Sequence, residues 1–423
     1  MKKNDSWLSS TSNSSYYRGS RRGGSTRSVA RFSRLIALVV VLLILVSIVQ
    51  LLRSVPLPRA SQTLSDAVIP GQRPSLPWPS SGGAEVAVQN VGIIGSFNPD
   101  IKIQLASVAK IITALVIVKD HPLSLGSTGP SVTITSKDVA NYRYMVSQQD
   151  SVMGVAVGET LTEYQMLEAL LIPSADNIAV KLAQWDAGST SAFVAKMNAY
   201  AKSIGMNSTT FKDPAGLSSG TVGTAPDQVK AGLKLLQNPV LSQIVAKPQA
   251  TLPVVGVQFN VNYNVGHDGF VGIKTGSIGS AANLVFAATG SSGSKDLIVG
   301  SVMGQQGVQP LASVLNLSRN LVNAARKIPT QEQVLKKGQL VGTINAPGNK
   351  PVSVIATQGV SFLGWPGLKG NYKVRFIKLP RNIAAGAKVG TLTVSVGAQS
   401  HTVELVTSSA VKAPSLAWRL ERF

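Results

Sequence analysis

Residues 103–112 read IQLASVAKII, in which Ser107 is followed three positions later by Lys110 and no other charge occurs. If this stretch begins a helix that runs to about Val118, the two side chains lie on one face, because residues three apart are neighbours on a helix. The helix is apolar nearly all round, which indicates burial. Burial penalises an ammonium group and favours a neutral amine, which can take a proton from a serine hydroxyl. The stretch therefore predicts a serine nucleophile with a lysine base.

A second polar cluster lies in LLIPSADNIA, residues 170–179. The helix before it is expected to begin at Thr162, where Gln165 completes a capping-box pattern, and to end before Pro173. Read locally, Ser174 is the N-cap of a new helix and Asp176 is a first-turn acid favoured by the helix dipole. The alternative is that this cluster belongs to the same site as Ser107.

A third cluster is GIKTGS, residues 272–277. Lys274 and Thr275 end a predicted strand, and Gly276 permits the backbone of a ligand to approach closely. The local alternative is an ordinary strand end at a turn.

Several kinds of chemistry have little support in the composition. The chain has no cysteine, which excludes disulfides and thiol nucleophiles. Its three histidines, His121, His267 and His401, offer little to a Ser-His-Asp triad, and no HExxH motif or other metal-ligand spacing occurs. The sequence therefore predicts an enzyme without a metal or a cofactor.

Taken together and in this order, the three clusters resemble the active site of penicillin-recognising serine enzymes. The segments GMNSTTFKDPAGLSS (205–219) and GIKTGSIGSAANLVFAA (272–288) are similar to segments of the D-alanyl-D-alanine carboxypeptidases. The C-terminal part, which ends in LAWRL, is similar to the β-rich domain that follows the catalytic domain in that family. The resemblance covers about residues 84–423.

The resemblance implies an enzyme that removes the terminal D-alanine from peptidoglycan stem peptides and that β-lactam antibiotics inhibit covalently. Ser107 would be the acylated nucleophile, Lys110 its base and Ser174 the proton shuttle to the leaving amine. Lys274 and Thr275 would bind the terminal carboxylate of the substrate, and the backbone N–H groups of Ser107 and Ser277 would form the oxyanion hole. The implied substrate-binding residues are Asp176, Asn177, Lys274, Thr275, Gly276 and Ser277.

One position departs from the family pattern, which usually has Ser-x-Asn where this chain has Ser174 and Asp176, with Asn177 next. An amide accepts and donates hydrogen bonds, whereas an ionised carboxylate only accepts and favours the ammonium form of Lys110. A protonated Asp176, or Asn177 in its place, would restore the pattern. One alternative function is therefore a weak or inactive wall-binding homologue. Another is a β-lactamase, against which stands the absence of glutamate between Ile178 and Ile273.

The patterning predicts an α+β fold. Helices are expected near Ser107, Thr162, Ala175 and Ser191, and the runs FVGIKT, ANLVFAAT and DLIVGSVM predict consecutive antiparallel strands. KKGQLVGTI (336–344) and AAGAKVGTL (384–392) echo one another, which indicates a small β-sandwich with two similar units. The expected domains are a basic disordered tail at 1–34, a transmembrane helix at 35–52, a Pro/Ser/Gly-rich linker at 53–83, a catalytic transpeptidase-like domain at 84–327 and a C-terminal β-rich domain at 328–423.

Residues 35–52 carry no charge over 18 positions, enough for a helix to cross a bilayer. The tail before them is rich in Lys and Arg, so the N-terminus is expected in the cytoplasm and the remaining chain outside. A cleaved signal peptide is the alternative, but no A-x-A-like site follows the apolar run. Of the formal net charge of +21, the tail supplies +7, and the remaining +14 suits an anionic wall or lipid surface outside the membrane. Nucleic acid is not an expected partner, because no basic motif is interleaved with aromatics.

Overall fold

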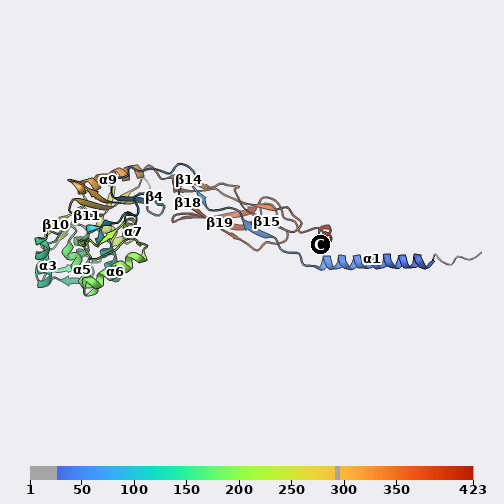
Figure 1. Cartoon of the computed structure of the whole chain (residues 1–423), viewed down its shortest axis with the longest axis horizontal. Helices are drawn as coiled ribbons and strands as arrows, with labels where there is room; N and C mark the ends of the chain where they lie inside the picture. The colour runs from blue at the N-terminus through green and yellow to red at the C-terminus, as the bar shows by residue number, and fades with distance from the viewer. Residues whose placement is uncertain (1–25, 291–295, 423) are drawn as a thin grey trace, which may run out of the picture.

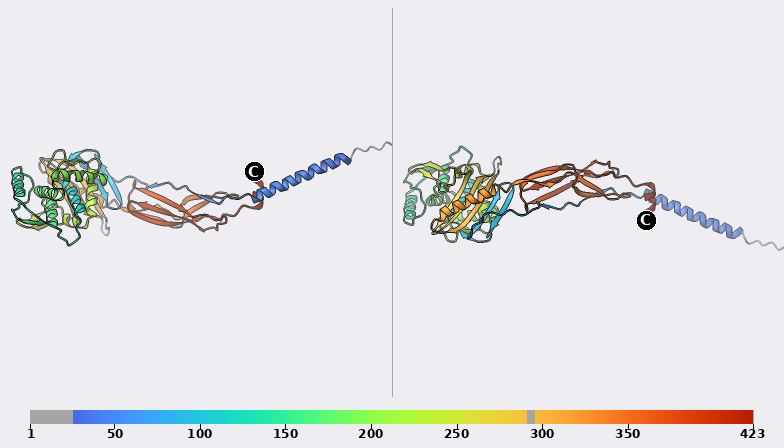
Figure 2. Two further views of the ribbon diagram at one scale, coloured as in Figure 1. Left: turned by 90° about the horizontal axis from the view of Figure 1, so that it is seen from below. Right: turned by 90° about the horizontal axis from the view of Figure 1, so that it is seen from above.

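The computed structural model describes residues 26–290 and 296–422. The chain is elongated, with three parts in line: an N-terminal helix, a β-rich domain and a mixed helix and sheet domain (Figure 1; Figure 2). We call the last two the β domain and the α+β domain. Of the basic tail predicted at 1–34, residues 1–25 lie outside the described residues, and residues 26–34 belong to the helix α1 rather than to a disordered tail. The predicted α+β class and the C-terminal β-rich domain are confirmed by the secondary structure.

The helix α1 spans Thr26–Leu52, and its apolar part, Ala30–Leu52, is 23 residues long. At 1.5 Å per residue this part extends about 35 Å, which exceeds the hydrocarbon thickness of a bilayer. Its large apolar side chains stand exposed, with Leu38 70% and Leu52 80% accessible. A helix that is apolar all round and packs against no core has the features of a membrane-spanning or signal segment.

The α+β domain is built on a five-stranded antiparallel sheet in the order β11-β12-β13-β3-β4. Three of its strands are the runs predicted from the sequence, and they pair consecutively as antiparallel neighbours. The N-terminal hairpin of the domain pairs with the last of these runs. The strands are β11 (Phe270–Ile278), β12 (Ala281–Thr289), β13 (Leu297–Gln306), β3 (Gly83–Val88) and β4 (Gly92–Phe97).

Helices cover both faces of this sheet, so the strands are apolar on both sides. On β12, Leu284 and Phe286 pack into a core with α9 (Pro310–Ala325), whereas Val285 and Ala287 pack into the larger helical core on the other face. The remaining helical elements are η1 (Ala106–Ala109), α2 (Lys110–Asp120), α3 (Ser136–Ser147), α4 (Glu163–Leu171), α5 (Asp176–Ala187), α6 (Thr190–Ser203), α7 (Ala225–Leu236) and α8 (Pro239–Val245). Three short strand pairs join them: β5 (Ile103–Gln104) with β8 (Val222–Gly223), β6 (Ser131–Thr133) with β7 (Thr160–Thr162), and β9 (Gln249–Leu252) with β10 (Gly256–Phe259).

The β domain contains a seven-stranded sheet and a separate pair of strands. The sheet order is β1 (Arg59–Gln62), β15 (Leu340–Asn345), β16 (Val352–Ala356), β20 (Gln399–Thr407), β19 (Lys388–Val396), β18 (Lys369–Phe376) and β2 (Ala67–Val68). The separate pair is β14 (Thr330–Leu335) with β17 (Val360–Gly364). A buried apolar core that includes Val341, Val354 and Leu392 lies within this domain.

The segment 53–83 differs from the independent linker that its composition predicts. Its residues Arg59–Gln62 form the edge strand β1 against β15, and Ala67–Val68 form β2 against β18. Val55, Ile69 and Leu76 are buried, with at most 5% exposure. The segment is extended, as expected for a Pro-rich chain. Its first part belongs to the β domain, whereas Leu76 packs into the core of the α+β domain.

The two echoing segments occupy equivalent places in the sheet. Gly338 and Gly386 both have left-handed φ angles, 78° and 74°, before β15 and β19. Both strands carry a bulge at the following glycine of the echo, Gly342 or Gly390. A Cβ at either glycine would lie 2.4 Å from a carbonyl oxygen of the neighbouring strand, which is β1 in one half and β18 in the other. The N-terminal segment thus supplies, in one repeat, the strand that β18 supplies in the other.

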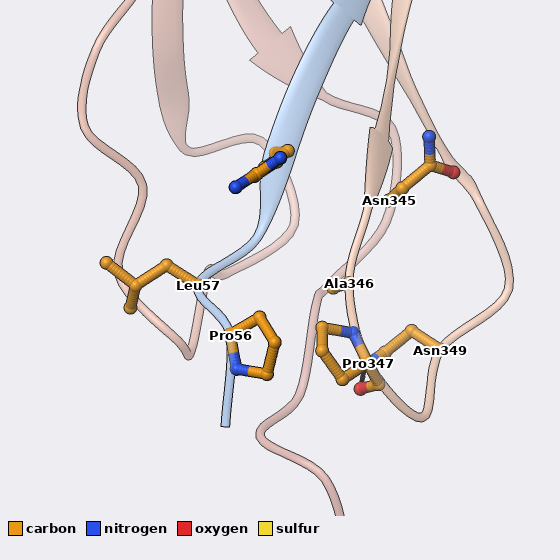
Figure 3. A pocket seen from close by; sticks show the side chains of 7 residues that line it. Pro56, Leu57, Asn345, Ala346, Pro347 and Asn349 are labelled. Carbon is orange, nitrogen blue, oxygen red and sulfur yellow. Dashed lines mark hydrogen bonds between the residues drawn. The ribbon is translucent and has the colours of Figure 1, made fainter. Parts of the chain in front are cut away.

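The β domain ends next to the helix α1. The short helix α10 (Leu416–Glu421) packs near the end of α1, and Arg422 donates hydrogen bonds to the carbonyl oxygens of Gln50 and Ser54. A hollow of about 460 Å³ lies beside this end, where Pro56 and Leu57 face Ala346 and Pro347 (Figure 3). The chain therefore returns to the end of α1 after completing both domains.

We expect a chain that begins at residue 84 to have a weakened β domain, because it lacks β1, β2 and the buried Val55 and Ile69. Each buried aliphatic side chain contributes about 1.5–3 kcal/mol, and the loss of two such groups, about 3–6 kcal/mol, corresponds to a fall of at least about 12 °C in the unfolding temperature of a domain of about 100 residues. Calorimetry of chains beginning at residue 54 and at residue 84 measures this difference. Equal unfolding temperatures for the β domain would show that the segment 53–83 is a mere tether.

Candidate active site

Ser107 and Lys110 meet at the start of the buried helix, as the sequence predicts. Ser107 lies in the 3₁₀ turn η1, which leads directly into α2. The Nζ of Lys110 donates a hydrogen bond to the Oγ of Ser107 over 2.6 Å. Lys110 is fully buried, whereas Ser107 is partly exposed. The hydroxyl is thus reachable from solvent while the amine beneath it is not.

Ser174 and Asp176 reach the same amine from the turn between α4 and α5. The Nζ of Lys110 lies 3.2 Å from the Oγ of Ser174 and 2.6 Å from Oδ1 of Asp176. Ser174 does not cap α5, contrary to its local interpretation: the N-cap is Ala175, which makes no side-chain capping bond. Ser174 instead has a left-handed φ of 70°, a conformation that is strained for a residue with a side chain. The turn thereby directs its hydroxyl to Lys110.

The contact between Lys110 and Asp176 is a buried ion pair. The two side chains are 0% and 2% exposed, so water contributes little to their solvation. Opposite charges at this distance attract strongly where water is excluded. Breaking such a pair by removing one partner leaves an uncompensated buried charge, whereas its net contribution to stability is small because both ions are desolvated.

Asn177 does not enter the site. Its Oδ1 accepts a hydrogen bond from the backbone N–H of Met153 over 3.0 Å, and its Nδ2 donates to the carbonyl oxygen of Met153 over 2.9 Å. Both functions of the amide are therefore engaged with the backbone, and Asn177 fixes the loop before Met153. The same loop is held by the backbone N–H of Asp176, which donates to the carbonyl oxygen of Ser151 over 2.7 Å.

The strand β11 brings Lys274, Thr275 and Gly276 to the site. A Cβ at Gly276 would lie 2.8 Å from the carbonyl oxygen of Leu105 and 3.0 Å from the backbone nitrogen of Ser107, so only glycine lets β11 approach η1 this closely. Lys274 is buried with 1% exposure. Burial lowers its pKa well below the usual value, and the nearby charge of Lys110 lowers that pKa further, while Asp176 opposes both effects.

The loop after Asp213 positions η1 from the other side, a role that the motif search does not detect. The carboxylate of Asp213 accepts hydrogen bonds from four consecutive backbone N–H groups, those of residues 215–218. It thereby folds the loop so that Gly216 lies against the carbonyl of Ala106. The run KDPAGLSS carries this information, because a carboxylate before Pro-x-Gly commonly folds such turns.

Asn283 is a second supporting residue that sequence reasoning misses. Its Nδ2 donates to the carbonyl oxygens of Gln104 and Leu105 over 2.9 and 3.0 Å, and its Oδ1 accepts from the backbone N–H of Gly304. The side chain joins β12 and β13 to the chain entering η1. A single asparagine within an apolar strand is the available signal, since a buried amide requires such partners.

These elements enclose an open cleft of about 580 Å³. Ser107, Asp176 and Ser277 line it, whereas Lys110 and Lys274 are buried beneath its surface. Among residues 26–290 and 296–422, no three His, Asp or Glu side chains cluster as metal ligands do. The remaining lining residues are Ala106, Tyr144, Met145, Gln148, Gln149, Asp150, Ser151, Gly216, Leu217, Ile278 and Gly279.

Comparison with known proteins agrees with this geometry. The model of the D-alanyl-D-alanine carboxypeptidase family matches residues 84–307, more than half of the chain. The chain belongs to this family. The resemblance seen in the sequence motifs is thus confirmed. The matched region ends directly after β13, the last strand of the five-stranded sheet in chain order.

Individual relatives match smaller shares of this family member. It is 35% identical over 174 residues to a D-alanyl-D-alanine endopeptidase of Pseudomonas aeruginosa, which covers 41% of this chain and 53% of the relative. The chain therefore spans about half the length of this relative. It is 25% identical over 312 residues to a D-alanyl-D-alanine carboxypeptidase of Bacillus subtilis, 70% of this chain and 76% of the relative.

The whole two-domain fold also has a solved counterpart. Penicillin-binding protein 5 from Haemophilus influenzae superimposes with a TM-score of 0.58 at 20% identity, covering 80% of this chain and 99% of the other. At this identity the match concerns the fold alone. It includes the β domain, which lies beyond the region matched by the family model.

We expect Gly216→Ala to destabilise the α+β domain far more than Gly279→Ala. Both glycines have positive φ angles, so both variants incur a backbone strain of about 1–2 kcal/mol. Only at Gly216 would the new Cβ clash, at 1.8 Å from the carbonyl oxygen of Ala106, whereas no atom lies within 4 Å at Gly279. Thermal unfolding of the two variants measures the difference. Similar losses would mean that the loop is not packed against η1 in solution.

Proposed function

We propose that this protein is a membrane-anchored serine D,D-carboxypeptidase that removes the terminal D-alanine from peptidoglycan stem peptides through an acyl-enzyme on Ser107. The observation that carries the proposal is the contact of one buried amine, that of Lys110, with the hydroxyls of Ser107 and Ser174. Membership of the D-alanyl-D-alanine carboxypeptidase family supports the substrate class.

In the proposed reaction, Lys110 first gives up the proton of its ion pair with Asp176. The neutral amine then takes the proton of Ser107 while Oγ attacks the carbonyl carbon of the penultimate D-alanine. The tetrahedral intermediate carries a negative oxygen, which the backbone N–H groups of Ser107 and Ser277 stabilise. Ser174 passes a proton from Lys110 to the leaving amine as the peptide bond breaks. Water then attacks the ester carbonyl and gives a proton to Lys110, which passes it to Oγ of Ser107 as the acid is released.

The terminal carboxylate of the substrate is assigned to Lys274 and Thr275. An ammonium group binds a carboxylate through charge and hydrogen bonds together. Because burial lowers the pKa of Lys274, its ammonium form gains from a bound anion, which replaces the lost hydration. The same site would take the carboxylate of a penicillin, so β-lactams are expected covalent inhibitors.

The exposed apolar helix α1 supports a membrane anchor, with the basic tail in the cytoplasm and both domains outside. The β domain then separates the α+β domain from the membrane, in line with its place between α1 and the cleft-bearing domain (Figure 1). Residues 328–423 carry 12 Lys and Arg against three Asp and Glu, a balance suited to an anionic wall. The substrate of the active site would be the stem peptides of that wall.

A fluorescent penicillin tests the proposal directly. We expect full-length protein in detergent to become stably labelled, and Ser107→Ala to lose the label altogether because Oγ forms the ester. Ser151→Ala is the matched control, since Ser151 lines the same cleft and is exposed. Released D-alanine from diacetyl-lysyl-D-Ala-D-Ala then measures the hydrolysis.

Labelling that survives in Ser107→Ala, or labelling absent from the unaltered protein, would contradict the acyl-enzyme. A label that forms and is rapidly released would indicate a β-lactamase instead. Cleavage of cross-linked peptides without release of terminal D-alanine would indicate an endopeptidase, the activity for which the Pseudomonas aeruginosa relative is named.

We expect Asp176→Asn to raise the rate of acylation of Ser107. The carboxylate holds the Lys110 ammonium at 2.6 Å, whereas an amide does not favour that charge. A barrier lowered by about 1.4 kcal/mol corresponds to roughly a tenfold faster reaction with penicillin. Stopped-flow labelling measures the rate, with Asp100→Asn, an exposed carboxylate outside the cleft, as control. An unchanged or lower rate would show that Asp176 does not restrain Lys110.

A further inference from the structure

Asp150 presents a carboxylate to the same cleft as Ser107, at a position that no motif identifies. It follows α3 and lines the cleft beside Ser151 and Asp176. Its side chain is partly buried. Within the described ranges 26–290 and 296–422, that side chain makes neither a hydrogen bond nor an ion pair, whereas Asp176 is paired with Lys110.

The charge of Asp150 is therefore not balanced inside the protein. The lining residues of the cleft, all of them within the described chain, include two aspartates and no Lys or Arg. Burial raises the pKa of Asp150, the charge of Asp176 raises it further, and Lys110 opposes both. A cationic group of a ligand placed at Asp150 would relieve this cost, because opposite charges favour one another most where water is partly excluded.

The loop that carries Asp150 is rigidly held. The backbone N–H of Asp150 donates to the carbonyl oxygen of Met145 over 3.1 Å, and the carbonyl oxygen of Ser151 accepts from Asp176 over 2.7 Å. Two residues after Ser151, the backbone N–H and carbonyl oxygen of Met153 are both hydrogen-bonded to the side-chain amide of Asn177. The backbone of Asp150 is thus held in place before a ligand binds, so that only its side-chain rotamer remains to be fixed, which lowers the entropic cost of recognition.

The position of Asp150 indicates which part of a peptide it meets. The proposed carboxylate site at Lys274 and Thr275 is buried, so the leaving D-alanine occupies the closed end of the site. The rest of the peptide must then run through the open part of the cleft, one wall of which is formed by residues 144–151. The residue that precedes D-Ala-D-Ala lies in this part of the peptide, so its side chain passes the wall that contains Asp150.

We propose that Asp150 is a specificity residue that binds a free amino group on the side chain of the residue preceding D-Ala-D-Ala. The inference rests on the proposed D,D-carboxypeptidase function and names a substrate preference of the same site. The enzyme would then prefer substrates in which the residue before D-Ala-D-Ala is a diamino acid with a free side-chain amine over substrates in which that amine is acylated. A carboxylate is the group that recognises an ammonium both by charge and by hydrogen bonding.

Two tripeptides that differ only in one acetyl group test this inference on the full-length protein in detergent. They are Nα-acetyl-lysyl-D-Ala-D-Ala, with a free side-chain amine, and its Nα,Nε-diacetyl form. We expect kcat/KM for D-alanine release to be roughly fivefold higher for the free amine at low salt, the upper end of the range for a partly exposed ion pair. Asp150→Asn should abolish the preference by slowing only the cationic substrate, and Asp100→Asn should retain it.

Equal kcat/KM values for the two peptides in the unaltered protein would overturn the inference. So would an Asp150→Asn variant that loses the same factor with both peptides, because the residue would then only support the loop. Calorimetric binding of both peptides to Ser107→Ala separates this result from a failure of the proposed function. Tighter binding of the cationic peptide there, lost with Asp150→Asn, would support the cation site even if no D-alanine were released.

Discussion

The contact on which the site depends is the hydrogen bonding of the buried Lys110 amine to Ser107, Ser174 and Asp176. An amine without access to water requires polar partners, so it holds together a 3₁₀ turn and the strained turn before α5. Its charge also acts on the buried Lys274 of β11, whose pKa it lowers. Lys110, Lys274 and Asp176 are all buried in this region, with at most 2% exposure. Since the charge of each depends on the others, a proton gained or lost at one alters the reactivity of all three.

The supporting structure is built to hold this group of residues still. Gly216 and Gly276 allow two segments to contact η1 at distances that no side chain permits, and Asp213 and Asn283 fix those segments through backbone hydrogen bonds. At the other end of the molecule, the chain entering the α+β domain first completes the sheet of the β domain. The chain therefore passes between the two domains twice, before β3 and after α9. This double connection fixes the distance between the active site and α1, which a single free linker would not do.

The sequence predicted those features that depend on local rules. Ser107 and Lys110 meet at the start of the helix, although Ser107 lies in the 3₁₀ turn before it and not in the helix itself. The capping box at Thr162 forms, and the three apolar runs pair as neighbours. Other features depend on contacts between distant segments. The left-handed Ser174 has no local cause, and Asn177, one residue from the motif position, is engaged by a loop 24 residues away. The edge strand β1 is four residues long in a Pro-rich segment, and only its partner 280 residues later makes it a strand. Asp150 belongs to no motif, so its place in the cleft emerges only from the packing of α3 against α5.

The most direct test of the account is a crystal structure of the full active-site region after reaction with penicillin. The account predicts an ester between the drug and Oγ of Ser107, its carbonyl oxygen between the backbone N–H groups of Ser107 and Ser277, and its carboxylate at Lys274 and Thr275. Lys110 should remain within hydrogen-bonding distance of Ser174 and the ester oxygen. A covalent adduct on any other residue, or a drug carboxylate that lies away from Lys274, would contradict the assignment of the site.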